Sequence, residues 1–161
     1  ALDHFQLGGE ALGLLDLGDH GIDHVDVGGH AHLRDQDGVE VLAGLLDHAA
    51  ETCLLTTPTV NGYKRYQPFQ LAPDRIQWGR DNKGAMIRGL MEPGDRASRI
   101  ENRVAEPAAN PYLYFASQIL CGLDGIERQI DPGTANNENL YPLTEAELSG
   151  LPLPDKVWDT E

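Results

Sequence analysis

A charged residue stands at every second position between residues 98 and 104, and this alternation constrains the fold more than any other feature of the chain. The residues concerned are Arg99, Glu101 and Arg103. Alternate side chains of a β-strand share one face, so these three would line a single surface. Two cations beside a carboxylate suit a site for a metal-bound anion, and they would equally form a solvated ladder of charges. Taken alone, this stretch leaves both interpretations open.

Short strands are predicted through the middle of the chain, at residues 75–79, 85–90 and 98–104. Residues 80–84 are the predicted turn between the first two strands. Residues 56–68 and the Gly-, Asn- and Pro-rich residues 131–144 are expected to form loops.

Helices are predicted before and after these strands in the sequence. In the helix expected at 39–50, one apolar stripe is formed by Val39, Leu42, Leu45 and Leu46. A second helix is expected at 111–124, with Asn110 as its N-cap and Pro111 at the first helical position, where a missing N–H costs nothing. A short capped helix is expected at 144–151. The chain therefore predicts an α+β fold, a mostly antiparallel sheet backed by the helices 39–50 and 111–124.

Charge is distributed unevenly over the 161 residues. The net charge is −14, yet residues 61–103 hold nine of the twelve Lys and Arg and only five acids, which gives that region a local charge of +4. A basic region in an acidic protein favours an anionic ligand such as phosphate or carboxylate. The overall acidity argues against unaided binding to nucleic acid or to an anionic membrane. No apolar run reaches the ~18 residues needed to span a bilayer.

Residues 1–37 differ in composition from the rest of the chain. All six histidines precede residue 49, and residues 1–51 lack Ser, Thr, Pro, Asn, Tyr and Lys altogether. This skew is also what a GC-rich gene translated out of frame would produce. Two domains are therefore expected, a Gly/Asp/His-rich segment at 1–37 and a different unit at 38–161. No signal-peptide pattern is visible, and the two cysteines match no zinc or redox spacing, so a cytoplasmic location is expected.

Six stretches form a recognisable series: VLAGLLDHA, PTVNGYKRYQP, WGRDNKGAMIR, SRIENRVAEPAANPYL, GLDGIERQIDPG and NENLYPL. In order and spacing they resemble the C-terminal part of the catalytic domain of the glutamine synthetase family, and NGYKR with RIENR and PAANPY is the most specific combination. The resemblance covers about three quarters of the chain. It implies an ATP-dependent ligase that joins glutamate to an amine through a γ-glutamyl phosphate.

The resemblance also implies roles for the residues of the alternating strand. Arg99 would contact a nucleotide phosphate, Glu101 would ligate Mg²⁺ or Mn²⁺, and Arg103 would hold a substrate carboxylate. The chemistry agrees, because a carboxylate among arginines stays ionised and suits a hard metal. Phosphoryl transfer itself depends on cations and metals placed around the moving charge. The alternating face would then be a clamp for ATP, metal and glutamate.

Further positions match the family outside this strand. Arg65 matches a glutamate-binding residue, and Arg88 matches a catalytic basic residue near the phosphates of ATP. Lys83 stands where many members have a catalytic Arg, and it keeps the charge but lacks the planar fork. His30 would be a second metal ligand if GHAH is the remnant of a His-x-His element. Tyr141 matches a position that some bacterial members modify by adenylylation.

Leu71 is a departure from glutamine synthetases proper. Six residues beyond the YKR arginine, those enzymes have a Glu that closes a flap and helps to deprotonate ammonium. A leucine cannot accept a proton, so an organic amine is expected in place of ammonia, as in the γ-glutamylamide and γ-glutamylpolyamine branch. The alternative is that the nearby Asp74 substitutes for the missing Glu.

Several parts of the family's active site have no counterpart in this chain. These are a strand with spaced Glu ligands, a nucleotide pocket, and a small domain that completes the site of a neighbouring subunit in a ring-shaped homo-oligomer. We therefore expect a fragment of a glutamate–amine ligase that is inactive alone. The alternative from a different class is a non-catalytic module, binding either a metal through its His/Asp-rich segment or an anion.

Overall fold

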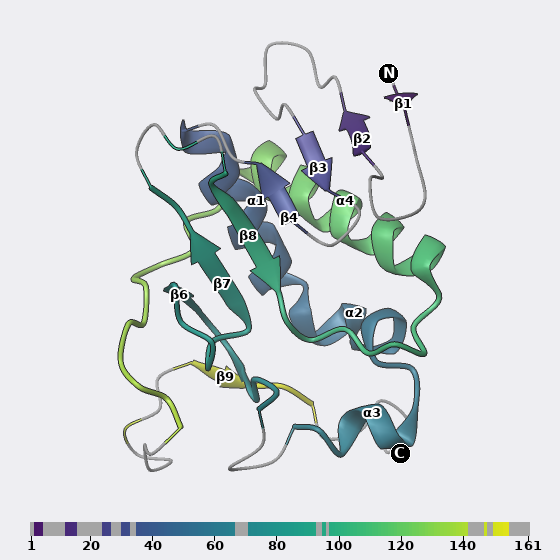
Figure 1. Ribbon diagram of the computed structural model, residues 1–161, viewed down its shortest axis with the longest axis vertical. Helices are drawn as coiled ribbons and strands as arrows, with labels where there is room; N and C mark the ends of the chain where they lie inside the picture. The colour runs from purple at the N-terminus through teal and green to yellow at the C-terminus, as the bar shows by residue number, and fades with distance from the viewer. Residues whose placement is uncertain are drawn as a thin grey trace.

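The computed structural model describes residues 2–4, 12–15, 24–26, 30–32, 35–66, 71–92, 95, 97–141, 147 and 150–154. The strands are β1 (Leu2–His4), β2 (Leu12–Leu15), β3 (His24–Asp26), β4 (His30–His32), β5 (Arg75–Ile76), β6 (Trp78–Arg80), β7 (Ile87–Leu90), β8 (Arg99–Asn102) and β9 (Leu151–Pro152). The helices are α1 (Asp35–Asp47), α2 (Ala49–Thr56), α3 (Val60–Tyr63) and α4 (Pro111–Arg128). Figure 1 shows how these elements are arranged.

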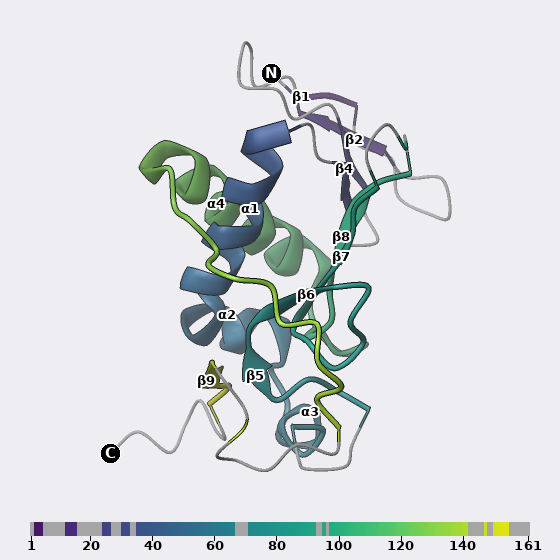
Figure 2. The same cartoon turned by 90° about the vertical axis from the view of Figure 1, so that its left-hand side faces the viewer.

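Seven strands form one sheet in the order β1-β2-β3-β4-β8-β7-β6, and β5 pairs with β9 in a separate ladder. Neighbouring strands are antiparallel except β6 and β7, which are parallel. Helices α1, α2 and α4 lie on one side of β7 and β8 (Figure 2). The predicted α+β fold, a mostly antiparallel sheet backed by helices, is thus confirmed.

The core lies between these helices and the central strands. It contains Ile87 and Ile100 from the strands, Val104 from the chain that follows β8, and Leu42 from α1, all at most 2% exposed. Burial of Ile100 and Val104 agrees with the alternation predicted for residues 98–104. The apolar stripe predicted on the first helix was wrong at Val39, which is 40% exposed.

The helix predicted at 39–50 is in fact two helices. Helix α1 begins earlier, at Asp35, and the chain turns at His48 before α2 continues to Thr56. His48 occupies the N-cap of α2 without a side-chain capping bond. Because its ring contacts side chains on other turns, described below, it marks a break that apolar periodicity alone does not reveal. The loop predicted at 56–68 contains the short helix α3.

Helix α4 starts as its sequence predicts. The Asn110 side chain accepts hydrogen bonds from the backbone N–H groups of Tyr112 and Leu113, at 3.0 and 3.4 Å. The helix runs beyond the predicted end to Arg128 and stops at Gln129, whose φ of 52° is left-handed. The capping rule therefore located the start, whereas the helix end lies four residues further on.

Close contact between α1 and α4 depends on two glycines. A Cβ atom on Gly44 would lie 2.0 Å from the carbonyl oxygen of Cys121. A Cβ atom on Gly125 would lie 2.1 Å from the carbonyl oxygen of Glu40. Both clashes are with backbone atoms, so neither can be relieved by rotating a side chain. The pair of helices therefore packs backbone to backbone, beneath the central strands.

The prediction for residues 75–90 was wrong in its connection. Instead of one strand at 75–79, β5 joins β9 and β6 joins β7, so the chain divides at Gln77 between two ladders. The expected turn at 80–84 does not reverse the chain into a hairpin. The loop instead carries the chain back to the start of β6, where Ile87 pairs with Trp78 and the Ile87 N–H bonds to the carbonyl of Gln77. Strands β6 and β7 consequently pair in parallel.

The carboxyl-terminal predictions are met only in part. Residues 131–141 contain no helix or strand, as expected, and they cover the edge of β6, where Asn136 N–H bonds to the Trp78 carbonyl at 2.8 Å. The helix predicted at 144–151 lies largely outside the described residues, and its last residue begins β9. Among the described residues, no helix has both the length and the apolar character that crossing a membrane requires.

Candidate active site

The carboxylate of Glu101 lies between two arginines at the centre of the sheet. Arg88 on β7 is the register partner of Glu101 on β8. Arg88 Nη1 donates to Glu101 Oε2 at 3.3 Å, and Arg103 Nε lies 3.9 Å from the same oxygen. Their side chains are 21%, 33% and 19% exposed, respectively for Arg88, Glu101 and Arg103. The structure therefore brings together three of the residues that the sequence selected, in a half-buried cluster.

Arg88 is held in place by a residue that the sequence analysis missed. Its Nε donates to Asp81 Oδ1 at 2.8 Å, and its Nη2 contacts the same oxygen. The hydrogen bonds to Asp81 are the main reason that the pKa of Arg88 is raised, and the bond to Glu101 adds to this effect. The guanidinium thus stays charged and bridges two carboxylates. The sequence signal for Asp81, which directly follows β6, was its place in the turn predicted at 80–84.

Arg65 contacts the backbone of the chain that follows β8. Its Nη1 donates to the carbonyl of Ala105 at 3.0 Å, two residues beyond Arg103 in the chain. Its guanidinium carbon lies 5.8 Å from the centre of the Tyr66 ring. The Tyr66 hydroxyl in turn donates to the carbonyl of Val104 at 2.8 Å. Arg65 and Arg103, predicted to hold glutamate, are therefore connected through residues 104 and 105.

The segment that carries Arg65 has a second anchor. Glu106 is only 9% exposed, and it accepts hydrogen bonds from both the backbone N–H and the hydroxyl of Thr59, each at 2.9 Å. The N–H of Glu106 bonds to the carbonyl of Thr56 at the end of α2. Helices α2 and α3 are therefore fastened to the chain that follows β8. Glu106 precedes a proline and lies outside the predicted strands and helices, so only the fold reveals its role.

Arg99 and Lys83 are placed differently from the central cluster. Arg99 lies at the start of β8 opposite Leu90, and its Nη1 donates to the carbonyl of Ala97 at 2.9 Å. Lys83 is exposed in the loop before β7, and its carbonyl accepts the Tyr141 hydroxyl at 3.1 Å. Among the described residues, neither side chain makes a polar contact with the cluster around Glu101.

His30 occupies an informative register position. In the ladder between β4 and β8, His30 is the Cα partner of Glu101. Glu101 is also the partner of Arg88 on its other side. Three strands therefore bring the predicted metal-ligand positions His30 and Glu101 to one level of the sheet, beside a predicted phosphate-binding residue.

Taken together, the fold and this cluster place a carboxylate among arginines on a mixed sheet, an arrangement that suits an anionic ligand. Comparison with known sequences identifies the family. Residues 28–160 match the family described as "Glutamine synthetase, catalytic domain". The chain belongs to the glutamine synthetase family. The match begins within residues 1–37, so the expected boundary at 37/38 stays a prediction.

Individual relatives agree with this assignment. The chain is 60% identical over 90 residues to gamma-glutamylanilide synthase of an Acinetobacter species, covering 56% of this chain and 18% of that protein. It is 40% identical over 111 residues to glutamine synthetase of Vibrio cholerae, covering 69% of this chain and 24% of that protein. Among solved structures, "Apo GmaS without ligand" matches with a TM-score of 0.63 and 35% identity, over 74% of this chain and 26% of that one. The chain thus spans a quarter or less of the length of these two curated relatives.

Proposed function

We propose that this chain forms the metal-, phosphate- and glutamate-binding part of an ATP-dependent glutamate–amine ligase. The observation that carries the proposal is Glu101, which lies between Arg88 and Arg103 and opposite His30 in the sheet. Family membership supports the reaction class, in which ATP phosphorylates the γ-carboxylate of glutamate and an amine displaces the phosphate. The proposed activity belongs to a longer protein, and the chain alone is expected to be inactive.

The residues present fit a divalent cation such as Mg²⁺ or Mn²⁺. Among the described residues, both ion pairs of Glu101 use Oε2, so Oε1 is the oxygen proposed to bind the metal. A carboxylate oxygen is the ligand that hard cations prefer, and His30 is the proposed second ligand. When bound, the metal would supply charge neutralisation for phosphoryl transfer.

The arginines fit the anionic groups of the substrates. Arg103 Nη1 is buried and has no hydrogen-bond partner among the described residues. An unpaired buried donor is costly, and a substrate carboxylate would satisfy it. We assign Arg65 and Arg103 to glutamate, Arg88 and Arg99 to the phosphates of ATP, and Lys83 to a supporting position in catalysis.

Manganese binding tests the metal site on the chain itself. The variant Glu101→Gln keeps the size of the side chain but loses its charge, and Glu92→Gln is the control because Glu92 is an exposed acid outside the cluster. Titration with Mn²⁺ followed by electron paramagnetic resonance should show binding weakened about tenfold or more in Glu101→Gln only. Circular dichroism checks that both variants are folded. Equal binding by the two variants would refute the proposed site.

We further propose that the amine is organic. Leu71 is 80% exposed, so it adds an apolar surface and no proton acceptor where the amine is expected. The relative named gamma-glutamylanilide synthase supports an aromatic amine such as aniline. A ring-shaped homo-oligomer and a cytoplasmic location remain expectations for the longer protein.

A chimaera tests the choice of amine. Residues 38–154 of this chain would replace the matching segment of the Acinetobacter relative, and aniline, ethanolamine and ammonia would be compared by ADP release. The variant Leu71→Glu should shift the ratio of kcat/KM toward ammonia by about tenfold or more, because a positioned base contributes about 10²–10⁴ to proton transfer. Asp74→Asn is the companion variant, since Asp74 is the other acid near this position. A chimaera that prefers ammonia, and loses it on Asp74→Asn, would overturn the organic-amine proposal.

A further inference from the structure

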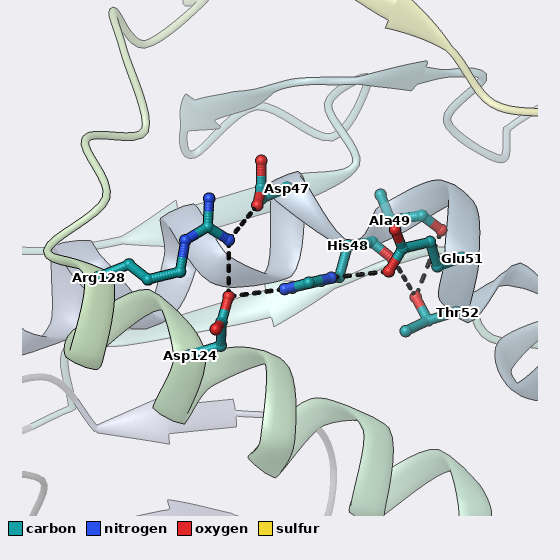
Figure 3. A network of polar contacts seen from close by, with 7 residues as sticks. All are labelled: Asp47, His48, Ala49, Glu51, Thr52, Asp124 and Arg128. Atoms are coloured by element: carbon teal, nitrogen blue, oxygen red, sulfur yellow. Dashed lines mark hydrogen bonds and ion pairs between the residues drawn. The ribbon is translucent and has the colours of Figure 1, made fainter.

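A network of charged side chains joins the helices α1, α2 and α4 (Figure 3). His48 lies at the break between α1 and α2. Its Nδ1 lies 2.8 Å from Glu51 Oε2 on α2, and its Nε2 lies 2.8 Å from Asp124 Oδ2 on α4. The His48 side chain is 25% exposed. A single imidazole therefore bridges two helices that are far apart in the sequence.

The two contacts together bear on the protonation state of the ring. A neutral imidazole has one N–H and one lone pair, and an ionised carboxylate only accepts hydrogen bonds. With the ring neutral, one of the two nitrogens would face a carboxylate lone pair to lone pair. Only the imidazolium donates to both Glu51 and Asp124 at once. Against two ionised carboxylates, the geometry thus favours the charged ring.

The other charged groups around the ring reinforce this state. Arg128 Nη1 donates to Asp124 Oδ2 at 2.8 Å and to Asp47 Oδ2 at 2.7 Å, so it ties α4 to the end of α1. The nearby thiol of Cys121 on α4 stays neutral, because burial raises its pKa to about 11. Around His48 there are therefore three carboxylates and one other cation. Because Arg128 already occupies the space between Asp47 and Asp124, these acids do not present an open metal site.

We propose that protonated His48 is a pH-sensitive clamp that fastens α2 to α4, and that its deprotonation releases α2. This proposal is independent of the proposed ligase function. The segment that carries Arg65 directly follows α2 in the chain. The carbonyl of Thr56, at the end of α2, also accepts the N–H of Glu106. Release of the clamp therefore loosens the support of the candidate site without touching it.

The direction of the pH effect follows from the hydrogen bonds. The bonds to Asp124, then to Glu51, raise the pKa of His48 above its ordinary value. A group whose pKa is higher in the folded state contributes stability that is fully present below about pH 6.5, its unfolded value. That contribution is lost as the pH rises through the folded value. The clamp is consequently closed in mildly acidic solution and open in alkaline solution.

Histidine-selective NMR on the whole chain tests the clamp. The ring signal of His48 is identified by its loss in His48→Gln, and its titration should have a midpoint above 6.5. Asp124→Asn and Glu51→Gln should each lower that midpoint, whereas Asp47→Asn, which contacts Arg128 and not the ring, should lower it less. A midpoint at or below 6.5, or an equal effect of Asp47→Asn and Asp124→Asn, would overturn the proposal.

Hydrogen exchange separates a clamp from a merely structural histidine. At pH 6, amides of α2 should exchange faster in His48→Gln than in the unchanged chain, by several-fold. At a pH well above the midpoint that NMR gives for His48, where the ring is neutral, the difference should vanish. A difference of the same size below and above the midpoint would mean that His48 acts by packing, and this would refute the clamp. The two proteins are compared at the same pH, so the protonation of the five other histidines affects both exchange rates equally.

Discussion

Replacing Gly125 by alanine tests the contact on which the α1–α4 pair depends. In an exposed helix interior this change would stabilise a protein by about 1 kcal/mol, because alanine is the better helix former. Here the new Cβ atom would lie 2.1 Å from the Glu40 carbonyl oxygen and 2.8 Å from the Gly44 nitrogen. Both are backbone atoms, so the helices must move apart.

The magnitude follows from these opposing effects. Inserting a methyl group into a packed interior costs about 1–3 kcal/mol, occasionally more, and backbone neighbours place this site at the upper end. After the gain in helix propensity, Gly125→Ala should lower the free energy of unfolding by about 2 kcal/mol. With a urea m-value of about 1–3 kcal/mol/M, the midpoint should fall by about 1 M.

A matched variant on the same helix is Gly122→Ala. Its Cβ would meet only the Val41 side chain, at 3.1 Å, and a side chain can yield by a few tenths of an ångström. Urea unfolding followed by circular dichroism should therefore show a much smaller loss for Gly122→Ala than for Gly125→Ala. If Gly125→Ala is as stable as the unchanged chain, the close backbone contact between α1 and α4 is wrong.

Further outcomes are expected from capping and from alkaline titration. Asn110→Ala removes the side chain that caps α4 and should cost about 1 kcal/mol of stability in urea unfolding, whereas the exposed Asn61→Ala should cost less than half of that. Burial raises the pKa of Tyr66 to about 12, so the unfolded chain ionises at this residue first and stability should fall between about pH 10 and 12. Tyr66→Phe should reduce this alkaline loss, and an unchanged pH profile would contradict the burial of its hydroxyl.

Local sequence rules determined the parts of this protein that depend on neighbours in the chain. Asn110 followed by Pro111 located the start of α4, because a cap is satisfied by backbone N–H groups only two and three residues away. The alternation around Glu101 located β8 and predicted that Ile100 lies on its buried face, because successive side chains of a strand point to opposite faces. The motif residues of the glutamine synthetase family also needed no coordinates to be recognised.

Tertiary structure alone decided how these pieces meet. The parallel pairing of β6 with β7 follows from a long-range choice of partner, in which β5 leaves for β9. Val39 is exposed although it belongs to the apolar stripe, because the elements packed against α1 decide which of its residues are buried. The break at His48 is likewise invisible in the periodicity, since its ring contacts Asp124, 76 residues away.

The candidate site divides in the same way. Residue types identified Glu101 and the arginines as candidates, because phosphates, carboxylates and hard cations have few suitable protein ligands. That Arg88 lies opposite Glu101 and is oriented by Asp81 depends on strand register, and register is set by the burial of a whole face. Short-range pattern therefore specified the chemistry and the local elements, whereas non-local packing decided which charges stand together.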